Sequence, residues 1–305
     1  MKRILNMTPE ELTHLTREEL LDGIRLSEGR VVASETIGVM PPMLTDVTNA
    51  EFAASMGADL IILNLFDVWE PVINALPPCE KVDVVRKVKE LTGRPVGINL
   101  EPVVDAMAAE EEIWKMSRGR YATVENAERA VEMGVDFIIL TGNPGNGVTN
   151  DALVSSLKKI KAAVGDKIAL VVGKMHASGI LSESGENIIT KEDVKLFIDN
   201  GADIVLFPAP GTVPGITMEY LRELISYTHS REKLAFTSIG TSQEGADKDT
   251  IRRIALLSKM AGSDNHHIGD SGYVGMALAE DIMAYSIALR GVRHTYHRMA
   301  QSIRR

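Results

Sequence analysis

The sequence of 305 residues predicts an α/β fold in which eight parallel strands alternate with helices. The first observation is a Gly-x-Asp signal that precedes an apolar run four times, at Gly57, Gly134, Gly201 and Gly262. Each copy follows a helical pattern, so its glycine stands where a helix C-terminus favours a left-handed residue. The second observation is one further strand-like run before each copy, at 30–38, 94–102, 167–176 and 233–241. Strict alternation of strands and helices indicates a parallel sheet.

The size of the repeat favours a closed sheet. Eight units of about 30 residues make about 250, the usual size of a (β/α)8 or TIM barrel. An open doubly wound sheet is the main alternative, but it has distinct edges, whereas a barrel is periodic. No linker or composition break interrupts the chain, so we expect a single domain over 1–305. It would carry an N-terminal helical cap over 1–28 and a basic helical tail over 291–305.

The individual elements follow in chain order. Thr8 and Pro9 place an N-cap before a proline, which predicts an extra helix over 8–21 at the closed end of the core. Strands are predicted at 31–36, 60–64, 94–102, 137–141, 168–174, 204–207, 234–238 and after Gly262. Helices are predicted at 45–56, 80–92, 124–133, from Thr149 or Asn150, and at 191–200, 217–228, 248–261 and 276–290. The stretch between Glu101 and Ala122 is too long for an ordinary loop and predicts a helix over the barrel mouth.

Composition excludes several functional classes. A hydrophobic content of 45% and a charged content of 25% are typical of a soluble globular protein. No apolar run has the length of a membrane span, and the first residues lack a signal-peptide core, so we expect a cytoplasmic location and no membrane partner. A net charge of −9 argues against a nucleic-acid surface. The single Cys79 follows two prolines and is interpreted as an ordinary loop thiol in a reducing compartment.

Polar residues collect at the C-terminal ends of the predicted strands, where such barrels place the active site. They are Glu35, Asn64, Asn99, Glu101, Thr141, Asn143, Lys174, His176, Ser238 and His267. Alternation of side chains along a strand points His267 into the barrel and His266 toward the helices, unless both are hydrogen-bonded core histidines. In the first strand, either Glu35 or the pair Ser34 and Thr36 faces inward.

Two loops of glycine and hydroxyl residues follow the seventh and eighth strands. They contain Gly240, Thr241 and Ser242, and then Gly269, Asp270, Ser271 and Gly272. Loops at these two strands, with a short helix N-terminus, form the common phosphate site of this fold. Glycines let backbone N–H groups approach the anion, and hydroxyl groups add donors. We therefore predict a phosphate site here, with simple turn formation as the alternative.

The stretch SIG…TIRRIALLSKMAGSDNHHIG resembles the closing two units of the phosphate-binding (β/α)8-barrel superfamily. The likeness covers about 233–275 in motif and the whole chain in rhythm. That superfamily includes histidine-biosynthesis isomerases, aldolases and flavin enzymes, so the resemblance implies the fold and leaves the reaction open. The phosphoenolpyruvate mutase and isocitrate lyase group is less similar. Its paired acidic metal motif is absent after the third strand, where this chain has Asn99-Leu100-Glu101.

The leading hypothesis is an enzyme that acts on a small phosphorylated metabolite as a lyase, aldolase or isomerase, without a required cofactor. Lys174 would be a base or a Schiff-base amine, because burial lowers a lysine pKa. His176 or His267 would move protons, and Glu35 or Glu101 would orient them. An ion pair of Lys174 with either glutamate is the structural alternative.

Two other functions stay open. A hydrolase could bind a divalent metal, with an open position for water, through Glu35, Glu101, His176, His267 and Asp270. A non-catalytic barrel could instead bind a phosphorylated ligand and signal through its long loop or its tail. The sequence does not decide whether a flavin binds.

The basic tail carries an apolar helical stripe of Val292, Tyr296, Met299 and Ile303. A stable helix needs to bury such a stripe. The tail must therefore cover its own barrel or meet another subunit, and closed homo-oligomers are the common outcome. We predict a homo-oligomer whose interface includes the tail.

Overall fold

A computed structural model describes residues 1–102, 116–142, 148–175 and 181–305. Its eight strands form a closed parallel barrel in which neighbours in sequence pair and β8 pairs with β1. The strands are β1 (Val31–Ile37), β2 (Leu60–Asn64), β3 (Val96–Leu100), β4 (Phe137–Leu140), β5 (Ala169–Gly173), β6 (Ile204–Pro208), β7 (Leu234–Ile239) and β8 (Asn265–Ile268). The predicted (β/α)8 barrel is thus confirmed, and the open sheet is wrong.

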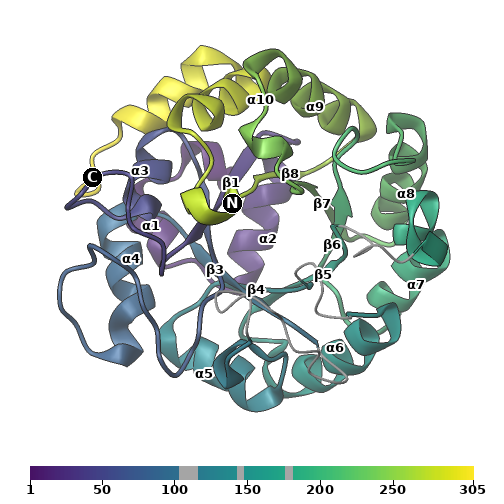
Figure 1. Cartoon of the computed structure of the whole chain (residues 1–305), viewed down its shortest axis with the longest axis horizontal. Coiled ribbons are helices and arrows are strands. Elements are labelled where there is room, and N and C mark those ends of the chain that lie inside the picture. The colour runs from purple at the N-terminus through teal and green to yellow at the C-terminus, as the bar shows by residue number, and fades with distance from the viewer. Residues whose placement is uncertain (103–115, 143–147, 176–180) are drawn as a thin grey trace.

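The helices form a ring outside the strands, with α2 across the middle of the ring (Figure 1). They are α1 (Pro9–Thr13), α2 (Arg17–Leu26), α3 (Asn49–Ser55), α4 (Val84–Thr92), α5 (Val124–Met133), α6 (Asn150–Val164), α7 (Lys191–Asp199), α8 (Met218–Ser230), α9 (Lys248–Ala261) and α10 (Ala279–Ala300). Among the described residues, no helix combines the length and the apolar character needed to cross a membrane. The helix predicted between Glu101 and Ala122 falls mostly outside those residues.

The N-terminal cap consists of two helices where the sequence predicts one. Thr8 caps α1 as expected, but His14 ends it, and Thr16 caps α2. Both caps are Thr-x-x-Glu boxes, which satisfy two backbone donors reciprocally and so start a new helix at each occurrence. The cap residues buried against the barrel interior are Ile4, Met7, Leu12, Leu20 and Ile24. The cap therefore closes the N-terminal end of the barrel, as predicted.

The four aspartates of the Gly-x-Asp repeat make the same hydrogen bond at the N-terminal end of the barrel. Each carboxylate accepts a backbone N–H from near the start of the preceding strand. The pairs are Asp59 with Val32 (3.0 Å), Asp136 with Val96 (2.8 Å), Asp203 with Leu170 (3.1 Å) and Asp264 with Ala235 (2.8 Å). Each carboxylate also pairs with a basic side chain. The repeat thus joins every odd strand to the next even strand through one recurring bond.

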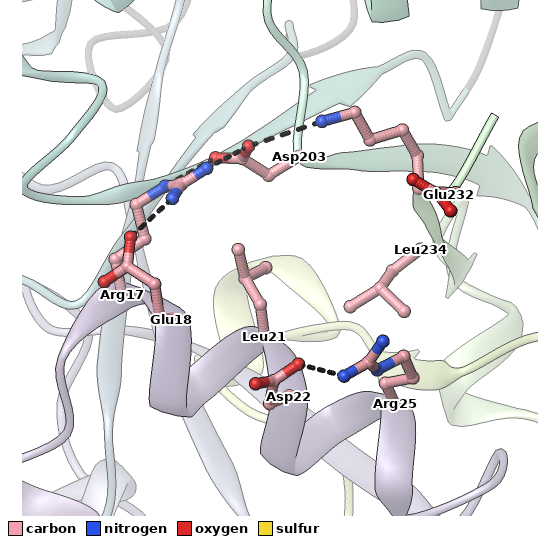
Figure 2. Close-up of a pocket in the computed structure, with 9 residues that line it drawn as sticks. Arg17, Glu18, Leu21, Asp22, Arg25, Asp203, Glu232 and Leu234 are labelled. Carbon is pink, nitrogen blue, oxygen red and sulfur yellow. Dashed lines mark hydrogen bonds and ion pairs between the residues drawn. The ribbon is translucent and has the colours of Figure 1, made fainter.

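A cavity of about 220 Å³ lies at the same end, between α2 and the starts of β6 and β7. Figure 2 shows most of its charged side chains joined by ion pairs around Leu21 and Leu234. Arg17 binds Asp203 at 2.5 Å, and Arg25 binds Asp22. Paired charges at the N-terminal end of a TIM barrel serve stability, since catalysis occurs at the opposite end. We therefore do not assign a site to this cavity.

Alternation of side chains decides which strand residues enter the barrel. The interior layer includes Val31, Ala33, Leu60, Ile62, Ile139, Val171, Leu206 and Phe236. The face toward the helices includes Val32, Ile61, Ile98, Ile138, Leu170 and Val205. Because Glu35 lies two residues beyond Ala33, it belongs to the interior face. This resolves the alternative that the sequence left open for the first strand.

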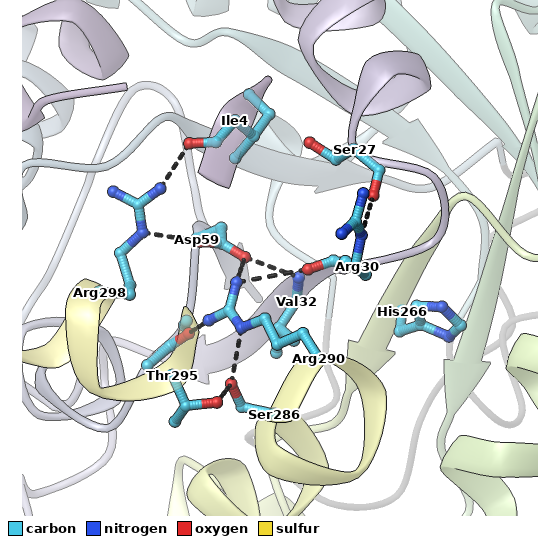
Figure 3. Close-up of polar contacts among 12 residues, drawn as sticks. Ile4, Ser27, Arg30, Val32, Asp59, His266, Ser286, Arg290, Thr295 and Arg298 are labelled. Atoms are coloured by element: carbon cyan, nitrogen blue, oxygen red, sulfur yellow. Dashed lines mark hydrogen bonds and ion pairs between the residues drawn. The ribbon is translucent and has the colours of Figure 1, made fainter. Parts of the chain in front are cut away.

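The predicted last helix and the predicted helical tail form one element. α10 continues beyond Gly291, whose φ of 75° marks a break, to Ala300. The tail packs on its own barrel through Arg298, which Figure 3 shows converging with Arg290 on Asp59. Most of the apolar stripe stays outside this contact: Val292 and Tyr296 are 52% and 55% exposed, whereas Met299 is half-buried.

Candidate functional site

A continuous hydrogen-bonded network fills the interior of the barrel at its C-terminal end. Its members come from the ends of β7, β8, β1, β3 and β2 and from the loop after β8. They are Ser238, His267, Glu35, Asn99, Asn64 and Asp270, and none is more than 8% exposed. All six were predicted as site residues from the sequence. Closure of the barrel brings them together, because parallel strands end at the same rim.

His267 is the centre of the first half of the network. Its Nε2 lies 3.1 Å from Oε2 of Glu35, and its Nδ1 lies 2.6 Å from Oγ of Ser238. A carboxylate only accepts, so Nε2 carries the proton and Nδ1 accepts from the hydroxyl group. The predicted inward orientation of His267 is confirmed. This order of a hydroxyl, an imidazole and a carboxylate suits proton transfer.

His266 has a different environment, although it is the adjacent residue. Its Nε2 lies 3.1 Å from the carbonyl oxygen of Gly29, and its ring meets the edge of Tyr285. Complete burial lowers the pKa of His266 to about 3. The residue is therefore a neutral core histidine, as predicted from the strand phase.

Two amides connect Glu35 to a second carboxyl group. Asn99 Nδ2 donates to Glu35 Oε1 at 2.6 Å and to Asn64 Oδ1 at 3.0 Å. Asn64 in turn donates to Asp270 Oδ2 at 2.7 Å. Burial raises the pKa of Asp270 to about 7, and the charge of Glu35 adds to the shift. Titratable groups whose environments push their pKa values apart are typical of an acid and a base in one site.

Some buried polar atoms at the mouth have no hydrogen-bond partner in the part of the chain that the structure describes, and two of them belong to the predicted substrate-binding residues Asn99 and Thr141. These two are Oδ1 of Asn99 and Oγ1 of Thr141. Buried polar atoms almost always find a partner, and an exception at a site needs a physical reason. A ligand hydroxyl group or amide that donates to Asn99 would supply one. These atoms therefore support the predicted substrate-binding role of Asn99 and Thr141.

Lys174 follows β5 directly and is 5% exposed. The interior phase of β5 runs through Val171 to Met175, which packs against the interior layer and lies 2.7 Å from Ser238. Lys174 stands in the opposite phase, with Leu170. Its predicted role as a base or Schiff-base amine stays a prediction. His176 and Asn143, also predicted site residues, lie outside the described residues.

Glu101 has a basic partner that the sequence did not indicate. Its Oε1 binds Arg120 at 2.6 Å, and both side chains are buried. Nineteen residues and a segment outside the description separate the two, so no local spacing links them. Glu35, not Glu101, is the described partner of His267. Within the described ranges, no three His, Cys, Asp or Glu side chains could together hold a metal ion, so these residues lend no support to the metal-dependent hydrolase.

The loops after β7 and β8 adjoin as predicted, since the two strands pair. Three of their donors are, however, engaged. The N–H of Ser271 donates to Glu244 at 2.9 Å, and that of Gly272 donates to Asp270 at 2.8 Å. The hydroxyl of Thr241 donates to the carbonyl of Thr212 at 2.7 Å. The part of the predicted phosphate position that these donors form is therefore closed in this conformation.

Ser242 and Gly240 belong to the same closed turn. The carbonyl of Gly240 accepts from Gln243, and that of Ser242 accepts from Gly245. Glu244, which the sequence analysis missed, lies in the short helix η7 (Gln243–Gly245) that this turn forms. The sequence did contain a signal for Glu244, because an acidic residue is unusual inside a loop that is predicted to bind phosphate.

A family described as a domain of unknown function (DUF7916) matches residues 5–305. The chain belongs to this family. No curated protein shows significant similarity to it. Membership therefore gives the family without a reaction, and the chemistry has to be argued from the site.

Solved structures are similar to this member of the family in fold. The crystal structure of an archaeal fructose 1,6-bisphosphate aldolase has a TM-score of 0.57 at 14% identity, over 88% of this chain and 98% of that chain. An archaeal fructose-1,6-bisphosphate aldolase with its catalytic lysine covalently bound to the carbinolamine intermediate has a TM-score of 0.56 at 14% identity, over 88% and 99%. These likenesses confirm the (β/α)8 barrel as the fold, and fold does not give function.

Asp270→Asn is expected to flatten the pH dependence of stability. Since the pKa of Asp270 is about 7 in the folded protein and 3.8 ordinarily, the folded state binds more protons between these values. The contribution of Asp270 is complete below about pH 4 and is lost as pH rises through 7. Because Asp270 titrates together with Glu35, we expect the wild-type free energy of unfolding to fall by about 1–3 kcal/mol over this pH range. Urea unfolding from about pH 4 to 8 measures it, and equal slopes for the two proteins would contradict the prediction.

Proposed function

We propose that this protein is a lyase of the aldol type, or an isomerase, that acts on a small phosphorylated hydroxy-carbonyl compound. The observation that supports the proposal most is the buried network with a His267–Glu35 pair at one end and Asp270 at the other. A base and an acid held a short distance apart are what both reactions need. The fold neighbours, named as fructose 1,6-bisphosphate aldolases, favour the lyase and a phosphorylated substrate.

In the retro-aldol cleavage, His267 removes the proton of the substrate hydroxyl group. The carbon–carbon bond then breaks, an aldehyde forms, and the electron pair passes to the carbonyl half as an enolate. Asp270, protonated part of the time near neutral pH, returns a proton to that half. In the isomerase reaction, the base removes a proton from the hydroxyl-bearing carbon while the acid protonates the carbonyl oxygen, which gives an enediol. Loss of the proton from the other hydroxyl group and return of a proton to the former carbonyl carbon then complete the isomerisation. Neither route needs an added oxidant or reductant.

Ser238 controls access to His267. Its hydroxyl group has two acceptors within reach, Nδ1 of His267 at 2.6 Å and Sδ of Met175 at 2.7 Å. A change in the χ1 angle of Ser238 would move its Oγ away from Nδ1 and leave that nitrogen free for the substrate. Glu35 holds the imidazole from the other side and stabilises its charged form after it takes a proton.

Solvent exchange in deuterium oxide tests the proposal. The protein is incubated with a panel of phosphorylated aldoses, ketoses and hydroxy acids, and mass spectrometry follows cleavage and deuterium incorporation next to the carbonyl group. We expect deuterium incorporation or cleavage with at least one phosphorylated hydroxy-carbonyl compound, and its loss in Glu35→Gln. Turnover confined to ester or amide hydrolysis would exclude the proposal.

Borohydride treatment with a turned-over substrate is expected to leave Lys174 unmodified. The Schiff base on Lys174 predicted from the sequence is the alternative mechanism, since the proton route through His267 and Asp270 accounts for the chemistry without an imine. Peptide mass spectrometry identifies any adduct, and Lys174→Met serves as the matched variant. A reduced adduct on Lys174 would replace this acid–base route by an imine mechanism.

The same residues also fit a serine hydrolase. Ser238, His267 and Glu35 follow one another at hydrogen-bonding distances, as a nucleophile, a base and its orienting group do. The two functions differ in how much they need Ser238. Ser238→Ala should change the rate of a lyase by less than about tenfold, because the hydroxyl group only covers the base and is not itself the general acid or base. It should abolish hydrolysis and labelling by a fluorophosphonate probe.

We also propose that a second copy of the chain covers the exposed stripe of Val292, Tyr296 and Ile303. The segment 291–305 holds no acidic residue, whereas the whole chain has a net charge of −9, so opposite charges favour self-association. Deleting the tail would also remove Arg298, which is part of the fold. Val292→Asp with Tyr296→Asp is therefore the sharper variant, and Lys191→Asp on the exposed surface of α7 is its control. Light scattering should give an oligomer for the wild type and for Lys191→Asp, and a monomer for the double variant. A monomeric wild type would contradict the proposed self-association.

A further inference from the structure

The loops after β7 and β8 hold a carboxylate of the chain itself. Glu244 comes from η7, yet its side chain is directed inward and the residue is 4% exposed. Oε1 accepts the backbone N–H of Ser271 at 2.9 Å. Oε2 is buried without a hydrogen-bond partner in the described part of the chain. A half-satisfied buried carboxylate is costly, and burial raises the pKa of Glu244 accordingly.

The surroundings of this carboxylate are shaped for an oxyanion. A methyl group on Gly269 would lie 3.0 Å from Oε1, so glycine lets the group approach the backbone. Ser271 has a positive φ of 54°, which turns its N–H toward Glu244. The hydroxyl oxygen of Ser271 is buried and also lacks a partner among the described residues. Backbone strain in a non-glycine residue of this kind collects at ligand sites.

Glu244 is the central residue of the three-residue helix η7, which ends at Gly245. A Cβ at Gly240 or Gly245 would meet nothing closer than 3.8 Å, so the backbone on either side of Glu244 is not tightly packed at these two positions. Thr241 and Ser242, beside it, are exposed to solvent. Outward rotation of Glu244 would release one oriented N–H and leave the serine hydroxyl free to donate. It would also take a negative charge away from Asp270.

We infer that the loops after β7 and β8 form an anion site which Glu244 occupies in the empty protein, and that an anionic substrate group binds there by displacing it. The group is an oxyanion, a phosphate or a carboxylate, whose oxygens replace those of Glu244. The identity of the anion as part of the substrate rests on the proposed function, but the exchange itself does not. This exchange also explains how a phosphate site can exist where the N–H of Ser271 already donates to Glu244.

Calorimetric titration with inorganic sulfate and phosphate, at constant ionic strength, tests the exchange without any turnover. Sulfate keeps its charge throughout the neutral range, so its binding reports the protein alone. Glu244→Ala should bind sulfate at least about tenfold more tightly than wild type. Glu244→Gln should fall between them, because its amide oxygen still accepts from Ser271 but carries no charge. Glu223→Ala, an exposed residue of α8, removes the same charge elsewhere and should leave the affinity unchanged.

Selective ¹⁵N-glycine labelling locates the anion. Sulfate should shift the amide resonances of Gly269 and Gly272 in the Glu244 variants and leave that of Gly165, remote on α6, unchanged. Should Glu244→Ala fail to fold, Glu244→Gln decides the matter by the same two measurements. Affinities equal to wild type in the folded variants, or a gain matched by Glu223→Ala, would overturn the inference. Because no reaction is measured, these results stay independent of the proposed lyase or isomerase activity.

Discussion

Asp59→Asn is expected to lower the free energy of unfolding by about 3–5 kcal/mol, the usual cost of removing one partner of a buried ion pair. Asp59 is wholly buried and binds Arg290, Arg298 and the N–H of Val32. Burial opposes its ionisation, but the arginine charges hold its pKa below the ordinary value. Asparagine keeps the shape and one acceptor, yet leaves two buried guanidinium groups without their counter-charge. Thermal and urea unfolding measure the loss.

Asp264→Asn is the matched control, because it changes the corresponding aspartate of the repeat. Asp264 accepts the N–H of Ala235, but its basic partner His229 is 42% exposed and can be solvated when the charge is removed. We expect a loss of about 1 kcal/mol there, that of a single hydrogen bond. Equal losses for the two variants would mean that the arginine cluster adds nothing beyond the repeated bond.

His267→Gln is expected to lower kcat about 100- to 10,000-fold on whichever substrate the exchange screen identifies, the range for removal of a general acid or base. Glutamine can still bond to Ser238 and Glu35, so the fold should persist, but it takes up no proton. KM should change little, because the lost interaction forms in the transition state. Steady-state kinetics across pH should also show the disappearance of one ionisation from kcat/KM.

His266→Gln provides the control at the adjacent position. Its side chain faces the helices and contacts Gly29 and Tyr285, so substitution should lower stability. The kcat of the folded fraction should stay close to wild type. If His266→Gln lost as much activity as His267→Gln at equal folded fraction, the assignment of the base to the inward histidine would be wrong.

The sequence by itself determined the number of strands, their closure and the end of the barrel that carries polar groups. Each of these follows from local information that repeats. A glycine at a helix end, an aspartate after it and an apolar run recur four times, and two-residue alternation separates His267 from His266. The six network residues could also be predicted from the sequence, because each stands at or just after the end of a strand. Helix boundaries were predicted less well where a second capping box, at Thr16, competed with the first.

Only the tertiary structure decided which groups pair. Glu35 could not be assigned to the interior until β1 was placed between β8 and β2, because its neighbours Ser34 and Thr36 are also polar. The partner of Glu101 is Arg120 and the occupant of the Ser271 amide is Glu244, neither of which has a spacing that marks it. The tail likewise packs by Arg298 and leaves Val292, Tyr296 and Ile303 of its apolar stripe exposed. The physical reason is the same in each case: a periodic pattern reports which face a residue takes, whereas the pairing of charges depends on distances that exist only after the barrel closes.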